Sequence, residues 1–191
     1  MIRYADDFVV CFESKAEAER FRAELIERLG EFGLEVEPSK TKILAFGPGA
    51  DRMAKEAGEG KAETFDFLGF THYCSRSRNG RRFRMKRRTS RKKFCQKLLA
   101  YKEWLKANRA RMCNGELWER TRMMLRGHFA YYGVTGNSRS LSDYAYQVKR
   151  LLFKRLNRQG GRRRMNWEKF TLMEQRFPFP TPRITVNLFS A

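Results

Sequence analysis

The stretch Arg3-Tyr4-Ala5-Asp6-Asp7-Phe8-Val9-Val10 decides how the first part of this chain is interpreted. Two adjacent carboxylates stand directly before an apolar run that favours a β-strand, residues 8–12. Neighbouring strand residues point to opposite faces, so a tight turn between two strands would place one or both acids at its tip. Carboxylate oxygens are ligands that Mg²⁺ prefers. We therefore predict either a metal-binding hairpin tip or an ordinary solvated turn, since Asp pairs also occur in such turns.

Charge is distributed unevenly along the 191 residues, although Lys and Arg outnumber Asp and Glu by 41 to 21 overall. Residues 1–75 contain 10 basic and 15 acidic side chains, whereas residues 76–191 contain 31 basic and 6 acidic ones. This asymmetry predicts a polyanionic partner for the second part of the chain. We predict no membrane partner, because no apolar run approaches the ~18 residues of a spanning helix.

Four cysteines and two histidines are scattered along the chain. None of the cysteines has close-paired metal spacing, so we predict no zinc site and expect free thiols in a reducing, cytoplasmic compartment.

Hydrophobic periodicity and turn residues predict an α+β fold with mixed structure first and helices second. Strands are expected at 8–12, 34–37, 40–46, 65–73, 73–78 and 81–85, with Asn79-Gly80 as a hairpin turn. Helices are expected from Ser14 to Gly33, from about 89 to 108, 114 to 132, 140 to 156 and 167 to 176. The composition predicts three parts: 1–75, a basic connector 76–88, and a helical domain 89–191.

The order of motifs resembles the C-terminal part of group II intron-encoded reverse transcriptases, or maturases. Tyr4-Ala5-Asp6-Asp7 followed by an apolar strand is similar to the catalytic hairpin of that family, and residues 32–43 are similar to its next motif. On this resemblance Asp6 and Asp7 would be catalytic and would bind Mg²⁺. Lys40 would be a further catalytic residue near the phosphates of the incoming nucleotide. The residues alone leave open that Lys40 is a solvated charge on an edge strand.

Residues 65–70 resemble the hairpin that grips the primer end, which would give Phe67, Leu68 and Gly69 a primer-grip role. An aromatic run of this kind is equally compatible with core packing. On the primer-grip resemblance, a DNA primer or DNA target is a further expected partner.

A dense basic segment follows, because residues 76–111 contain 16 basic side chains and one acid, Glu103. Residues 125–133 and the Pro-rich end resemble the thumb, or maturase-specific, domain, which binds intron RNA and assists splicing. The predicted RNA-binding residues are Arg81, Arg82, Arg84, Lys86, Arg87, Arg88, Arg91, Lys92, Lys93, Arg126, His128, Tyr132, Arg162, Arg163 and Arg164. From chemistry alone, His128 and Tyr132 are also compatible with helix packing.

The resemblance implies an RNA-directed DNA polymerase of compact bacterial type whose fingers and third metal-binding aspartate are not in this chain. We therefore expect the chain alone to be inactive as a polymerase. A complementing N-terminal reverse-transcriptase fragment is then an expected partner. The alternatives are a stand-alone RNA-binding splicing helper and a decayed remnant without a catalytic role.

Overall fold

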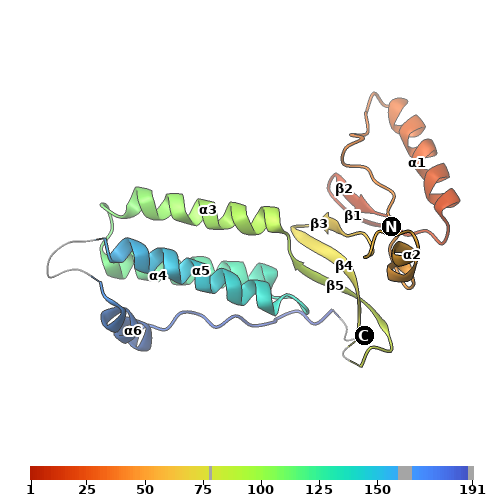
Figure 1. Ribbon diagram of the computed structural model, residues 1–191. Coiled ribbons are helices and arrows are strands. Elements are labelled where there is room, and N and C mark those ends of the chain that lie inside the picture. Colours follow the sequence, from red (N-terminus) through yellow and green to blue (C-terminus); the bar gives the residue numbers. More distant parts are fainter. Residues whose placement is uncertain (78, 159–164, 189–191) are drawn as a thin grey trace. The chain divides into compact units, whose positions relative to one another are not determined.

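The computed structural model describes residues 1–77, 79–158 and 165–188, and confirms the α+β fold (Figure 1). The chain forms two compact units. Unit 1 comprises residues 1–67 and 74–84, and unit 2 comprises residues 68–73 and 85–191. The boundaries of the three parts expected from composition stay a prediction.

Unit 1 begins with the predicted hairpin, in which β1 (Ile2–Tyr4) pairs antiparallel with β2 (Asp7–Val9). Two helices follow, α1 (Lys15–Gly30) and α2 (Ala50–Glu56). The side chain of Ser14 accepts a hydrogen bond from the Glu17 N–H at 3.2 Å, which is the expected N-cap of α1.

The strands predicted at 34–37 and 40–46 are absent from the structure, so that prediction is wrong. A turn occupies the middle of this segment, where the carbonyl of Glu37 accepts hydrogen bonds from the N–H groups of Lys40 and Thr41, both at 3.1 Å. Alternating polarity favours a strand only where a neighbouring strand completes the hydrogen-bond ladder. Here the N–H groups of Lys40 and Thr41 bond within the turn, and the Ala45 N–H donates to the Glu63 carboxylate at 3.1 Å.

A three-stranded sheet contains β3 (Phe65–Phe67), β4 (Phe70–Arg76) and β5 (Phe83–Thr89), in the order β3-β4-β5. Leu68 and Gly69 form a tight turn that divides the single strand predicted at 65–73, with φ angles of 49° and 80°. Gly80 lies in the expected hairpin loop between β4 and β5, with a φ angle of 73°.

Unit 2 contains four helices among its described residues, close to the predicted positions. They are α3 (Arg91–Asn108), α4 (Asn114–Tyr132), α5 (Ser138–Leu156) and α6 (Trp167–Arg176). Their apolar faces form one core, to which the extended tail adds Phe179. The tail follows α6 as the three prolines from Pro178 to Pro182 predict, because proline cannot continue a helix.

Burial differs sharply between the units. The core cluster of large buried side chains lies in unit 2, whereas the buried apolar residues described in unit 1 are Ala50 and Ala54. In unit 1 the hairpin residues Ile2 and Tyr4 are 66% and 65% exposed. Unit 1 therefore presents apolar surface where a folded domain normally has a core.

Candidate functional site

The two predicted catalytic aspartates lie at the tip of the β1–β2 hairpin. Tyr4 pairs with Asp7, so Ala5 and Asp6 form the connection between the strands. Both carboxylates are exposed, and Asp7 shares a sheet face with Tyr4. Ala5 has a φ angle of 51°, which is uncommon for a residue with a side chain. Such strained backbone conformations cluster at functional sites.

The aspartate pair is a partial fit for Mg²⁺. This ion is commonly held by one or two carboxylates together with waters and substrate phosphates, and Asp6 and Asp7 supply oxygen donors of that type. Across residues 1–77, 79–158 and 165–188, no group of three or more His, Cys, Asp or Glu side chains could hold a metal. A two-metal centre would therefore require additional carboxylates.

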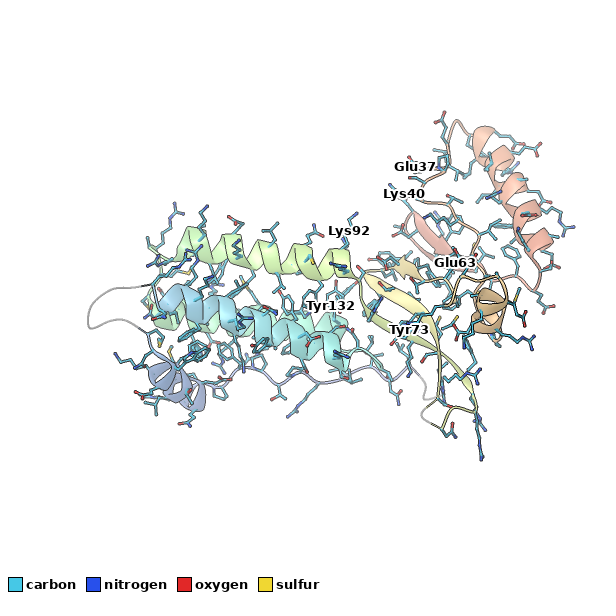
Figure 2. All side chains as sticks on the ribbon, in the orientation of Figure 1. Glu37, Lys40, Glu63, Tyr73, Lys92 and Tyr132 are labelled. Carbon is cyan, nitrogen blue, oxygen red and sulfur yellow. The ribbon has the colours of Figure 1, made fainter. Side chains whose placement is uncertain are left out.

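Lys40 lies in the Glu37–Thr41 turn and is exposed (Figure 2). Ser39 shapes this turn, because its hydroxyl donates to the Glu37 carboxylate at 2.8 Å and its N–H donates at 3.3 Å. These two hydrogen bonds, with a smaller contribution from the charge of Lys40, hold the pKa of Glu37 below its usual value. No described contact joins Lys40 to Asp6 or Asp7, so its catalytic role stays a prediction.

The predicted primer-grip residues form the β3–β4 turn, and α4 holds that turn at its tip. The hydroxyl of Tyr131 donates to the carbonyl of Leu68 at 3.1 Å. A Cβ atom placed on Gly69 would lie 3.0 Å from the hydroxyl oxygen of Tyr132. The sequence predicts no role for Tyr131 here, because no local pattern links it to a turn 63 residues earlier.

The predicted RNA-binding residues on β5 divide between its two faces. Strand alternation places Arg84, Lys86 and Arg88 on one face and Arg87 on the other. The guanidinium of Arg88 lies over the ring of Tyr73 on β4, 5.8 Å from its centroid. Arg87 faces inward: its Nη1 is shielded from solvent without a hydrogen-bond partner, and burial lowers its pKa.

The first turn of α3 presents Arg91, Lys92 and Lys93 to solvent, and Figure 2 shows Lys92 projecting from the helix. Within the described residues, none of the three has a carboxylate at ion-pair distance. Positive charge is unfavourable at a helix N-terminus, where unpaired N–H groups attract anions instead. A bound phosphate would relieve this repulsion.

The remaining predicted RNA-binding residues differ in accessibility. Arg81, Arg82 and Arg126 are exposed, whereas His128 and Tyr132 are buried on the inner face of α4. The imidazole of His128 stacks on Tyr144 with ring centroids 3.6 Å apart. Burial, with a smaller contribution from the charge of Lys97, lowers the pKa of His128 to about 4. Arg162, Arg163 and Arg164 lie outside the described residues.

Residues 1–72 match the family model described as "Reverse transcriptase (RNA-dependent DNA polymerase)". This match confirms the reverse-transcriptase resemblance for that part of the chain, a segment that includes the aspartate hairpin and the β3–β4 turn. Neither the curated proteins nor the solved structures gave a match. Among the described residues, no helix is long and apolar enough to cross a membrane.

Proposed function

We propose that this chain is the C-terminal part of a group II intron-encoded RNA-directed DNA polymerase, or maturase, and that it binds intron RNA to assist splicing and mobility. The observation that carries the proposal is the Asp6-Asp7 pair at an exposed hairpin tip, inside the segment that matches the reverse-transcriptase family. The basic helical unit that follows supplies side chains suited to RNA.

In the proposed reaction, a primer hydroxyl attacks the α-phosphate of a nucleotide and pyrophosphate leaves. Asp6 and Asp7 would hold Mg²⁺, which when bound neutralises the charge that develops on the phosphate oxygens. Lys40, on its exposed turn, would pair with the departing phosphates. The turn formed by Leu68 and Gly69, with Phe67 before it, would hold the primer end.

A complementing polypeptide is part of this proposal. A two-stranded hairpin is at best marginally stable in water, and β1 and β2 each have one edge without a strand partner among the described residues. The exposed Ile2 and Tyr4 would become buried against an added strand. A polypeptide that supplies both a strand and further carboxylates would complete the fold and the metal site together.

The proposed RNA-binding residues are the accessible basic side chains on β5, its preceding loop, α3 and α4. Those in unit 1 are Arg81, Arg82 and Arg84, and those in unit 2 are Lys86, Arg88, Arg91, Lys92, Lys93 and Arg126. Arg84 and Lys86 are half-buried and the others are exposed. His128 and Tyr132 are left out because both are buried, and Arg87 because its Nη1 is shielded from solvent. The predicted role of Arg162, Arg163 and Arg164 stays a prediction, because they lie outside the described residues. Binding through the accessible basic side chains depends on phosphate contacts, so the affinity is expected to fall steeply with salt.

A second candidate function is that of an RNA-binding splicing helper without catalysis. The observation that favours it is the unequal burial of the two units, because unit 2 has a continuous apolar core of its own. In this case unit 1 would contribute little to function. A third alternative is a decayed remnant, in which no catalytic role is left.

Binding of the purified chain to a structured group II intron RNA and to a size-matched unrelated RNA, over a salt series, tests the RNA part. We expect preference for the intron RNA to persist at moderate salt. Equal binding of both RNAs that is lost together as salt rises would contradict intron recognition.

The catalytic part is tested by Mg²⁺-dependent primer extension after the chain is combined with the N-terminal fragment of a related enzyme. Asp7→Asn should abolish any extension, because the amide is a poorer ligand for Mg²⁺ than the carboxylate. Lys15→Gln, on the exposed face of α1, is the matched control. Extension that survives Asp7→Asn would remove the aspartate pair from the mechanism.

A further inference from the structure

The strongest feature outside the proposed RNA-binding residues is a pair of exposed aromatic rings on α5 and α6. Tyr146 on α5 is 59% exposed, and Trp167 at the start of α6 is 58% exposed. Large aromatic side chains are usually buried, since each removes a large apolar area from water. Neither residue has a role in the functions proposed above.

Two phenylalanine rings hold the indole ring of Trp167 in place. Its ring stacks on Phe153 of α5 with centroids 3.7 Å apart and planes 13° apart, and the ring of Phe170 lies edge-on to it with centroids 5.7 Å apart. Since Phe153 covers one face, the exposed area of Trp167 includes the opposite face. The indole is therefore a preorganised flat surface, and binding a second ring would cost little side-chain entropy.

Tyr146 lies on the same side of α5 as Phe153, because the two residues are seven positions apart, close to two helical turns. The guanidinium of Arg150, between them in sequence, lies over the Tyr146 ring at 5.6 Å from its centroid. Tyr146 and Phe153, on which Trp167 stacks, are thus about 10 Å apart along α5, and Arg150 covers one face of the Tyr146 ring.

The charged side chains of α5 and α6 indicate what kind of partner this surface binds. The exposed basic residues of α5 include Arg139, Arg150 and Lys154, whereas its one acidic residue is Asp143. On α6, Glu174 is already paired with Lys149, and Glu168 is the other acid. A basic surface with exposed aromatic rings between the charges fits a nucleic acid strand better than an apolar protein patch.

We propose that Trp167 and Tyr146 form a stacking site for unpaired bases of a single-stranded nucleic acid segment, with Arg150 and Lys154 contacting its phosphates. Bases in a duplex already stack on their neighbours, so only a loop or a single strand offers a free face. This inference rests on the proposed RNA-binding function. It adds that this part of unit 2 recognises single-stranded rather than double-stranded nucleic acid.

The test measures binding of the full chain to an unstructured oligoribonucleotide of about ten nucleotides and to its duplex with the complementary strand, by fluorescence anisotropy. Trp167→Leu and Tyr146→Leu should each weaken single-strand binding roughly 10-fold and change duplex binding by less than about 2-fold. Trp167→Phe and Tyr146→Phe should retain most of the affinity, since an aromatic face remains. Leu172→Ser, an exposed apolar residue on α6, is the matched control and should change neither affinity.

Single-strand affinity unchanged in both leucine variants would overturn the stacking site, as would equal losses for the single strand and the duplex. Either result leaves the proposed RNA binding intact, provided that the unaltered chain binds RNA. Failure of the unaltered chain to bind any RNA would instead overturn the proposed function and the inference with it. The phenylalanine variants control for misfolding, because Trp167→Phe keeps a ring on Phe153 and Tyr146→Phe keeps a ring beneath Arg150.

Discussion

Asn137 binds Thr89, 48 residues earlier in the chain, through both ends of its side-chain amide. Its Oδ1 accepts a hydrogen bond from the Thr89 N–H at 2.8 Å, and its Nδ2 donates to the Thr89 hydroxyl at 2.9 Å. Nδ2 also donates to the carbonyl of Tyr132 at 2.9 Å. One buried side chain therefore joins the end of β5, which directly precedes α3, to the end of α4.

Replacing Asn137 with leucine should destabilise unit 2 by about 2–4 kcal/mol, because the Thr89 N–H would be buried without its partner and the Thr89 hydroxyl would lose its donor. The Tyr132 carbonyl would lose one of its two hydrogen bonds and keep the one from the Val134 N–H. Urea denaturation followed by near-ultraviolet circular dichroism reports on the aromatic core of this unit. Ser138→Ala, at the exposed neighbouring position, should change stability by less than about 0.5 kcal/mol. Equal stability of the two variants would show that Asn137 does not join these elements.

Gly133 is the point where the C-terminal tail meets the end of α4, and it should not accept a side chain. A Cβ atom there would lie 2.5 Å from the carbonyl oxygen of Phe129 and 2.8 Å from that of Arg183. We expect Gly133→Ala to displace the tail and to remove hydrogen-exchange protection from the N–H groups of Thr185 and Val186, which donate to the Gly133 carbonyl.

The matched control is Gly127→Ala, in the interior of α4, where nothing lies within 4 Å of the added methyl group. This variant should gain about 0.5–1 kcal/mol, because alanine has the higher helix propensity. If both substitutions raised the melting temperature, the close approach of the tail to Gly133 would be refuted.

Stability should fall as the pH decreases from about 6.5 to about 4, in part because of His128. Its pKa is lowered to about 4 in the folded protein, against an ordinary value of 6.5. The unfolded chain therefore binds more protons in this window, so acid favours unfolding, whereas above pH 6.5 the contribution of His128 is fully present.

His128→Phe keeps an aromatic ring against Tyr144 and removes the titrating group. The urea midpoint of this variant should decrease less between pH 7 and pH 5 than that of the unaltered protein. Burial raises the pKa of Tyr144 to about 12, so its hydroxyl stays neutral throughout the experiment. Identical pH profiles would show that His128 does not contribute to acid sensitivity.

Removing a charge from the first turn of α3 should weaken RNA binding without changing its sequence preference. The slope of log affinity against log salt decreases by about one for each phosphate that the protein no longer neutralises, so Lys92→Gln should show this decrease. The slope is measured with intron and unrelated RNA over the same salt series. Lys15→Gln removes an equal charge from unit 1 and should leave the slope unchanged. A similar decrease in both variants would indicate a nonspecific effect of net charge.

Local physical chemistry accounts for the parts of the fold that the sequence predicts correctly. The helices α1 and α3 begin where Ser14 and Ser90 meet apolar periodicity, and both signals act over a few neighbouring residues. The aspartate hairpin is also predictable, since two adjacent acids cannot both follow one strand face. Asn79-Gly80 marks the separate turn between β4 and β5, because glycine readily adopts a positive φ angle.

The errors arise where distant residues decide the structure. The segment 34–46 has the alternation of a strand, but a strand forms only with a partner that local sequence does not specify. The family resemblance implies a hairpin at 65–70, but the strand pattern misses the β3–β4 turn because Leu68 adopts a positive φ angle of 49°. The Tyr131 hydroxyl that binds the Leu68 carbonyl also lies on another element.

The amino-acid sequence by itself determined the α+β class, the positions of most helices, the turn that carries Asp6 and Asp7, and the concentration of positive charge after residue 75. These depend on backbone preferences, side-chain periodicity and composition, which are properties of short segments. Only the tertiary structure decided that the Nη1 of Arg87 is shielded from solvent, that His128 is buried against Tyr144, and that Trp167 stacks on Phe153 while staying 58% exposed. The physical reason is that the burial of a side chain depends on which elements pack around it, and those elements are distant in the sequence. The same arginine, histidine or tryptophan can therefore bind a ligand where it is exposed or fill a core where it is buried.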